Sequence, residues 1–316
     1  MSFDQLTPDS MILALEKATG ERLTGYTAKF PSYINRVYEF RTIQGVKLIA
    51  KFYRPGRWSE AAILDEHQFI KELHEAEVPV VVPQTLLNNQ TIDQHEEIWF
   101  AVFPKKAGRE LDITGYEDWL RLGTLVARMH NVGSMHPANA RLRIHPSFST
   151  SKDLSYLCSE ILPARFQSAY TKLVEHLIQI SVPLFADTQT IRIHGDLHRG
   201  NILNRLDEGL MLIDFDDMAM GPPVQDLWLL LPDRAQNSTE EIELFIEGYE
   251  QFRNFDRRSL KCIESLRAMR MVYFLAWCSR QIRDIQFRKN FPDWGTDSFW
   301  QKEINELEEQ LKFIER

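Results

Sequence analysis

The stretch from Ile191 to Asp217 constrains this 316-residue chain more than any other part of it. An apolar run enters a polar loop, HGDLHRGN at positions 194–201, and two further short apolar runs follow, separated by a polar turn. Short apolar runs between turns predict strands arranged as a small β-meander. The polar side chains of Asp196, Asn201 and Asp214 are then expected to converge at one edge of that meander.

Two acids and an amide at this spacing suit phosphoryl transfer, in which a protein mainly positions the reactants and neutralises charge. Mg²⁺ prefers oxygen ligands and keeps several waters, so Asn201 and Asp214 suffice as its protein ligands beside nucleotide phosphates. Asp196 precedes Asn201 by five positions, which is the D-x-x-x-x-N spacing of a kinase catalytic loop. Asp196 is therefore the candidate base for an acceptor hydroxyl.

A lysine and a glutamate far upstream complete the candidate site. Lys51 ends an apolar run, as the strand-three lysine of kinases does. In a helix predicted over 58–77, Ile63, Glu66 and Ile70 share one face, so Glu66 turns toward the core. Glu66 is the chosen partner of Lys51, and the adjacent Asp65 is the fallback. A strand-end surface lysine and a solvated helical acid remain open as alternatives.

The HGDLHRGN loop, followed by IDFDD at 213–217, resembles the aminoglycoside/choline phosphotransferase branch of the kinase-like superfamily. That branch has HGD where typical protein kinases have HRD. The chain is also similar to the bacterial stress response kinase A family, from about residue 30 to beyond Trp277. This wider similarity rests on SY at 32–33, NRVY at 35–38, KFYRP at 51–55, EHQF at 66–69, FAVFP at 100–104, GP at 221–222 and VQDLW at 224–228.

The resemblance implies an α+β, bilobal protein-kinase-like fold. A nucleotide-binding lobe with a small antiparallel sheet would span 1–104, and a larger, mainly helical lobe for catalysis and acceptor binding would span 105–316. A shift in composition after Pro104 supports that boundary. Ser32 and Asn35 would contact the phosphates from a loop without glycines, and the strand that ends near Phe103 would contact adenine through its backbone.

The function implied by the resemblance is ATP- and Mg²⁺-dependent phosphoryl transfer to Ser or Thr of proteins, the chain itself included, in a bacterial stress response. From the residues alone, the acceptor is only a hydroxyl. A small-molecule alcohol kinase that acts on an aminoglycoside, choline or homoserine-like compound is the main alternative. A nucleotide-binding regulator without transfer is a third possibility. A hydrolase with Zn²⁺ or Mn²⁺ held by His194, Asp196, His198 and Asp214 would leave Lys51 and Glu66 unexplained.

Several side chains near the motif have expected roles outside the chemistry. Asp216 stands where protein kinases have the glycine of DFG, and the segment after it is too short for a phosphorylated activation loop. Asp226 is expected to anchor the catalytic loop, and His130 to be structural. The arginines of the predicted helix 259–284 either line an acceptor cleft or pair with acids of the same lobe. They are Arg267, Arg270 and Arg280.

Net charge, cysteine spacing and the lengths of apolar runs argue against several other classes of protein. The net charge of −8 and the lack of a dense basic run argue against a nucleic-acid partner. Three widely spaced cysteines predict reduced thiols rather than disulfides or a zinc site. The longest apolar run, 271–278, is far shorter than the roughly 20 residues of a spanning helix, and the first ten residues lack a signal pattern. We therefore expect a cytoplasmic monomer without a membrane partner.

Overall fold

The computed structural model describes residues 3, 6–32, 34–206, 208–282 and 284–315. By contacts the chain divides into two compact units. The first unit comprises Met1–Asp112, Ala138–Arg141 and Arg199–Asp217, and the second comprises Ile113–Pro137, Leu142–His198 and Met218–Arg316. Both units are discontinuous in sequence, and the lobe boundary after Pro104 stays a prediction. Tyr33 and Asp207, which belong to the predicted phosphate loop and the predicted polar turn, lie outside the described residues.

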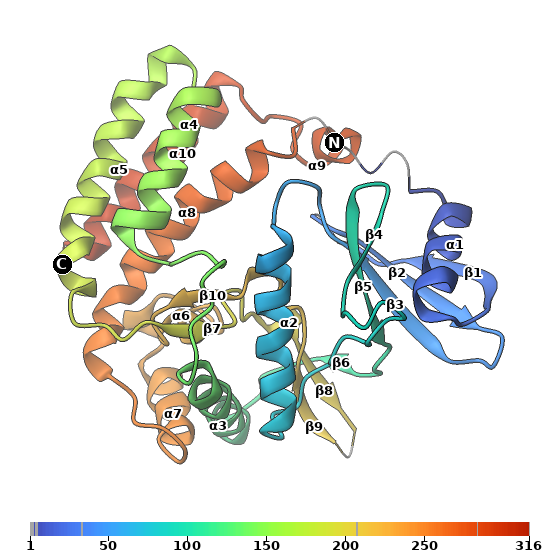
Figure 1. Cartoon of the computed structure of the whole chain (residues 1–316). Helices are drawn as coiled ribbons and strands as arrows, with labels where there is room; N and C mark the ends of the chain where they lie inside the picture. Colours follow the sequence, from blue (N-terminus) through green and yellow to red (C-terminus); the bar gives the residue numbers. More distant parts are fainter. Residues whose placement is uncertain (1–2, 4–5, 33, 207, 283, 316) are drawn as a thin grey trace. The chain divides into compact units, whose positions relative to one another are not determined.

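The first unit contains an antiparallel sheet with strands in the order β1-β2-β3-β5-β4 (Figure 1). A turn that contains Gln44 and Gly45 joins β2 to β3, and Gly45 has a positive φ of +87°, which glycine adopts without strain. The strands are β1 (Leu23–Lys29), β2 (Arg36–Thr42), β3 (Lys47–Phe52), β4 (Asp93–His95) and β5 (Ile98–Pro104).

The two-residue alternation of β3 decides which side chains face which helix. Leu48, Ala50 and Phe52 are buried in one core with Leu15 of helix α1 (Pro8–Thr19). Lys51 points to the opposite face, where helix α2 (Glu60–Glu75) lies. Thr7 caps α1 and Ser59 caps α2, each by accepting a backbone N–H of the first turn.

The catalytic-loop region differs from the predicted meander. Strand β8 (Ile202–Arg205) pairs with β9 (Gly209–Leu212) and with β6 (Arg109–Glu110) in the first unit. Strand β7 (Ile191–Ile193) pairs instead with β10 (Ala219–Gly221) in the second unit. The prediction of three consecutive strands in one meander is therefore wrong, because the loop after β7 bonds to side chains beyond β10 rather than turning back into a hairpin. Val80 and Leu212 of the first unit form an isolated β-bridge.

The second unit is mainly helical, as predicted. Its principal helices are α3 (Tyr116–Gly133), α4 (Ser151–Glu160), α5 (Ala164–Phe185), α6 (Gln225–Trp228), α7 (Thr239–Tyr249), α8 (Ile263–Ser279), α9 (Ile285–Asn290) and α10 (Asp297–Ile314). A π-helical turn, Pro146–Thr150, precedes α4, and a 3-10 segment, Arg257–Cys262, precedes α8. Pro163 lies between α4 and α5, as the N-cap residue of α5. The α+β fold class predicted from the sequence is thereby confirmed.

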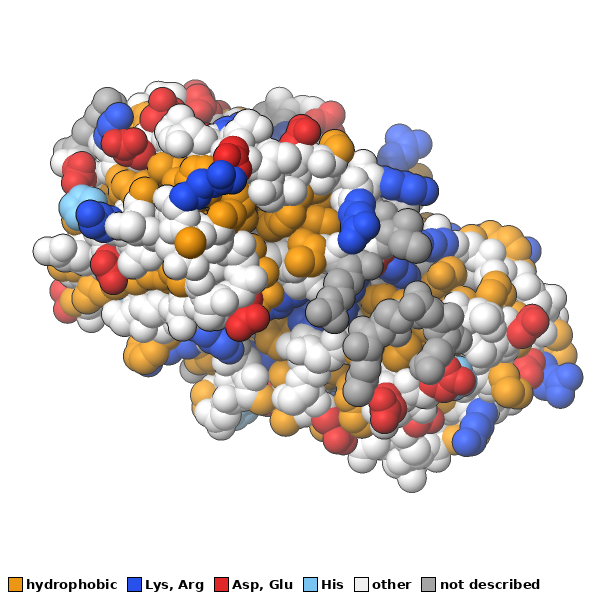
Figure 2. All heavy atoms as spheres, turned by 90° about the horizontal axis from the view of Figure 1, so that it is seen from above, with side chains coloured by type: hydrophobic (Ala, Val, Ile, Leu, Met, Phe, Trp, Pro, Cys, Tyr) orange, Lys and Arg blue, Asp and Glu red, His pale blue; other side chains and the backbone are white. Residues whose placement is uncertain are grey.

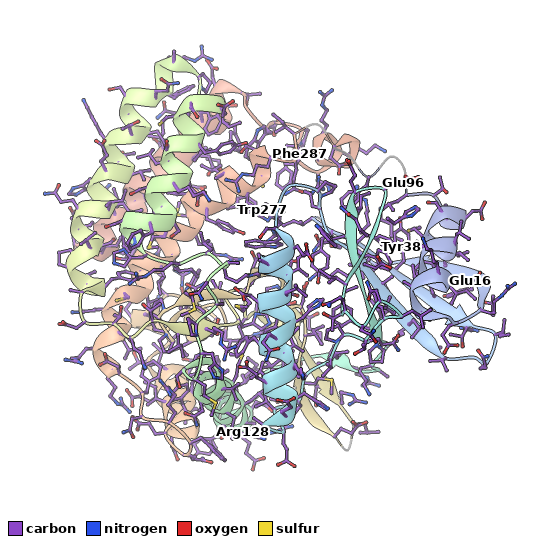
Figure 3. The ribbon with its side chains drawn as sticks, in the orientation of Figure 1. Glu16, Tyr38, Glu96, Arg128, Trp277 and Phe287 are labelled. Carbon is purple, nitrogen blue, oxygen red and sulfur yellow. The ribbon has the colours of Figure 1, made fainter. Side chains whose placement is uncertain are left out.

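An aromatic cluster joins the last three helices. It includes Trp277 of α8 and Phe287 of α9, which Figure 3 labels, and Phe291 and Trp294 connect them to α10. On the face shown in Figure 2, acidic and basic side chains are interspersed with apolar ones. Among the described residues, no helix is long and apolar enough to cross a membrane. The thiols of Cys158, Cys262 and Cys278 are free.

Candidate active site

Lys51 stands at the centre of a buried ion network in the first unit. Its Nζ lies 3.1 Å from Asp214 Oδ1, 3.0 Å from Asp216 Oδ1 and 3.6 Å from Glu66 Oε1. Lys51 is 7% exposed and Glu66 is 1% exposed. The fallback partner, Asp65, instead accepts the backbone N–H of Ala140. The structure thus pairs Lys51 with Glu66 rather than with Asp65.

Burial and charge set the protonation states of this network. Burial alone would lower the pKa of Lys51, but Asp216, Glu66 and Asp214 reverse that effect and raise its pKa well above the ordinary value. Burial would raise the pKa of Asp216, yet Arg57, Lys51 and Arg141 outweigh it and hold the pKa well below its usual range. Burial raises the pKa of Glu66, partly offset by Lys51 and Arg141. Lys51 is therefore cationic, and Asp216 is ionised.

Two arginines that sequence reasoning did not single out complete the network. Arg57 Nη1 lies 2.7 Å from Asp216 Oδ2, and its Nη2 donates to Asp217 Oδ1 at 2.6 Å. Arg141 donates to the carbonyl oxygen of Asp216 and lies 3.7 Å from Glu66 Oε2. Neither arginine carries a local sequence signal, because each is placed by segments distant in the chain. The sequence marked Asp216 only as a departure from DFG.

Asp214 combines an exposed carboxylate with an unusual backbone. It follows β9 with a φ of +58°, in the left-handed region that non-glycine residues seldom adopt, although aspartate does so more readily than most. Its side chain is 55% exposed between neighbours that are largely buried. Such strain is often stored where a side chain must point to a ligand. Asn201 lies in the same unit, 8% exposed, with its carbonyl oxygen bonded to the N–H of Ile213.

The residues predicted to contact nucleotide differ in how deeply they are buried. Asn35 is buried, and its Oδ1 accepts the N–H of Arg54 at 3.1 Å, which engages the amide oxygen within the fold. Ser32 is partly buried in the segment between β1 and β2. Phe103 is partly buried near the end of β5, and its ring meets the edge of His67 at 6.0 Å. Their contacts with ATP stay predictions.

Asp226 fixes the backbone of the catalytic loop in the second unit, as predicted. Its Oδ2 accepts the N–H of His194 at 2.8 Å, and its Oδ1 accepts the N–H of Gly195 at 2.9 Å. Gly195 has a φ of +82°, which glycine adopts without strain. His130 also contacts Asp226 Oδ2, at 3.1 Å, and its Nδ1 contacts Tyr249 Oη at 2.9 Å. Burial lowers the pKa of His130 despite Asp226, so this histidine is structural.

Asp196 lies on the loop that Asp226 holds. Its Oδ1 accepts a hydrogen bond from Arg270 Nη2 at 2.7 Å, and its Oδ2 lies 3.7 Å from His198 Nε2. The Asp196 side chain is 23% exposed. The carboxylate thus accepts a hydrogen bond from Arg270, lies near a ring nitrogen of His198 and is reachable by solvent. Such a group can orient a hydroxyl and accept its proton.

Within the described ranges, no three His, Cys, Asp or Glu side chains gather as a metal-binding group. An oxygen pair such as Asn201 and Asp214 fits Mg²⁺, which takes its remaining ligands from water and nucleotide phosphates.

Comparisons with known proteins agree on the family. The phosphotransferase enzyme family, APH, matches residues 28–262. "Stress response kinase A" of Shigella flexneri is 36% identical over 99% of this chain and 95% of its own length. "Serine/threonine protein kinase RdoA" of Salmonella typhimurium is 34% identical over the same shares. The solved structure of amicoumacin kinase hAmiN with AMP-PNP, Ca²⁺ and Ami aligns with a TM-score of 0.77 at 18% identity, covering 97% of this chain and 94% of that one.

The amicoumacin kinase has the same fold as this chain, and the stress response kinase A relatives are similar to it in sequence over nearly its full length. The resemblance to stress response kinase A, first inferred from short motifs, is therefore confirmed over the whole chain. The chain belongs to the APH phosphotransferase enzyme family and, within it, to the stress response kinase A relatives.

Proposed function

We propose that this phosphotransferase moves the γ-phosphoryl group of ATP to the hydroxyl of Ser or Thr in proteins, itself included, as part of a bacterial stress response. The observation that carries the proposal is the buried Lys51, held by Glu66 beside Asp214 in one unit. A strand lysine paired with a helix glutamate is the phosphate-binding device of kinases. Lys51 is cationic there, so it can bind nucleotide phosphates.

Each residue has one role in the proposed reaction. Asp196 orients the acceptor hydroxyl and takes its proton as the oxygen bonds to the γ-phosphorus and the bond to ADP breaks. Asp214 and Asn201 hold Mg²⁺, which when bound neutralises charge on the phosphates. Ser32, Asn35 and the backbone near Phe103 contact the nucleotide. The Asp226 bonds to the loop amides keep Asp196 in position.

A protein acceptor is preferred because the relatives that cover nearly the whole chain bear stress kinase names, and one is named a serine/threonine protein kinase. The amicoumacin kinase likeness, at 18% identity, concerns the fold. A small alcohol is nevertheless the second candidate acceptor, because enzymes that share one fold can act on different substrates.

Labelled ATP and purified protein test the proposal. We expect label on the chain itself or on a generic Ser/Thr protein substrate, and a loss of at least about 10²-fold in the Asp196→Asn variant, the lower bound for a positioned base. Asp9→Asn, an exposed aspartate in the first turn of α1, is the matched control and should retain full activity.

Other patterns of label would contradict this assignment. Transfer only to a small alcohol refutes the protein acceptor. Nucleotide binding without any transfer points to a regulator. Equal transfer by the wild type and the Asp196→Asn variant removes Asp196 from the role of base.

A further inference from the structure

Arg267 and Arg270 of α8, and Arg280 directly after its last residue, have different partners. Arg267 Nε lies 3.6 Å from Glu264 Oε2, and Arg280 Nη2 lies 3.8 Å from Asp153 Oδ1. Arg267 also stacks over the ring of Trp228, with its guanidinium carbon 5.0 Å from the ring centroid. These two arginines thus pair with acids of their own unit that have no role in the proposed chemistry.

Arg270 differs because its partner is the proposed base. The guanidinium donates from Nη2 to Asp196 Oδ1 at 2.7 Å, a short charge-assisted hydrogen bond. The side chain of Arg270 is 38% exposed and that of Asp196 is 23% exposed, so solvent and ligands reach the pair. In this arrangement the guanidinium occupies one oxygen of the carboxylate that an acceptor hydroxyl must approach.

We infer that Arg270 recognises an anionic group that the acceptor carries next to its reactive hydroxyl, an inference that rests on the proposed transfer. A carboxylate or phosphate on the acceptor can replace Asp196 as the guanidinium partner, because arginine binds both groups in a bidentate manner. The exchange keeps Arg270 paired and releases Asp196 Oδ1 to the hydroxyl. An acceptor with a neutral neighbour offers no replacement partner.

For a protein acceptor, the preferred site is a Ser or Thr beside Asp, Glu or a phosphorylated residue. For a small acceptor, the preferred compound is a hydroxy acid rather than an amino alcohol. Arg270 makes and breaks no covalent bond in either case. The acceptor proton still moves to Asp196, and the acceptor oxygen still forms the new bond to phosphorus.

Two synthetic peptides that differ only in Asp or Asn beside a single Ser test this inference in the full-length protein. We expect the wild type to prefer the Asp peptide by roughly tenfold in kcat/KM, the size expected of one charge-assisted hydrogen bond. Arg270→Gln should bring the ratio near one, and Arg270→Lys should restore part of it. Arg280→Gln, directly after the same helix but paired with Asp153, should keep the wild-type ratio.

A second pair, 3-hydroxybutyrate and 3-hydroxybutyramide, separates the kind of acceptor from the recognition of charge. Transfer to the hydroxy acid but to neither peptide refutes the protein acceptor and supports Arg270 recognition. Equal rates within each pair overturn the inference while the proposed function stands. A preference for the charged member of a pair that persists in Arg270→Gln also overturns the inference.

A positioning role alone is also distinguishable. If Arg270 only oriented Asp196, Arg270→Gln would slow both members of a pair by the same factor and leave their ratio unchanged, which would overturn the inference. A wild-type protein that labels itself or a generic protein but no member of either pair overturns the inference, because the Asp peptide and the hydroxy acid carry the group that Arg270 would recognise. A protein that transfers phosphate to no acceptor at all contradicts the proposed function. Thermal unfolding of each variant confirms that it is folded before rates are compared.

Discussion

At the scale of single residues, Asp216 is the least expected member of the site. It is 5% exposed, pairs with Lys51 and Arg57, and replaces a residue that is glycine in the DFG motif. The carboxylate thus ties β3 and the segment before α2 to the residues after β9. Asp216 holds the lysine in place before any nucleotide arrives.

Replacing Asp216 with Asn should lower the free energy of unfolding by about 3–5 kcal/mol, because buried cations lose their partner. The loss should depend on pH. The folded pKa of Asp216 lies below the value of about 3.9 in unfolded chains, so its stabilising contribution is complete above that pH and disappears as the pH falls through the folded pKa.

Urea unfolding at a series of pH values measures both effects. Below about pH 4 the wild type should lose stability more steeply than Asp216→Asn. Asp217→Asn, which removes a more exposed partner of Arg57, is the control and should cost less. Parallel pH curves for the wild type and Asp216→Asn would refute the depressed pKa.

Sequence reasoning reached the residues with a local signature and missed those placed by tertiary contacts. Lys51 ends an apolar run in β3, Glu66 lies on the inner face of an amphipathic helix, and Asp214 follows the short strand β9. Arg57 and Arg141 stand in irregular segments, and their partners come from other parts of the chain. No spacing rule connects such residues, so only the folded structure assigns them to the network.

At the scale of elements, α3 and α7 approach each other through glycines. A Cβ on Gly248 would lie 2.1 Å from the carbonyl oxygen of Leu120, and one on Gly123 would lie 2.0 Å from that of Phe245. Both contacts are with backbone, which cannot rotate away as a side chain can. The two helices therefore pack at a distance that any larger side chain would increase.

Gly248→Ala should destabilise the protein by about 1–3 kcal/mol or more, the usual cost of overpacking. Chemical denaturation measures the change. Gly115→Ala, at the N-cap of α3, is the control, because a Cβ there meets nothing within 4 Å, and it should cost no more than about 1 kcal/mol through the weaker cap. Similar losses in the two variants would mean that close packing is not the cause.

The sequence predicted helices well where apolar residues recur with the helix period and a capping residue precedes them. It predicted strands poorly where a strand pairs with one that is distant in the chain. The helix predicted over 58–77 appears as Glu60–Glu75 behind its Ser59 cap. The pairing of β7 with β10 could not be read from short apolar runs. Which strands pair depends on side-chain bonds made elsewhere, such as those of Asp226.

At the scale of the whole molecule, binding of nucleotide should stabilise the fold independently of transfer. Mg²⁺ with AMP-PNP at a hundred times its Kd should add about 2.7 kcal/mol of stability, seen as a rise in Tm. Lys51→Met should show little of this rise. Lys71→Met, an exposed lysine on α2, should show all of it. A full rise in Lys51→Met would remove Lys51 from the nucleotide site.

The discontinuity of the first unit has a consequence for the order of events during synthesis. Residues up to Asp112 supply the sheet, Lys51 and Glu66, but β8, β9 and Asp216 belong to a segment that ends at Asp217. At ordinary translation rates the ribosome needs on the order of ten seconds to make the intervening chain. During that interval Lys51 has only Glu66 as a partner, and Arg57 lacks both Asp216 and Asp217. The nascent N-terminal part is thus expected to remain incompletely folded until β8 and β9 have been synthesised.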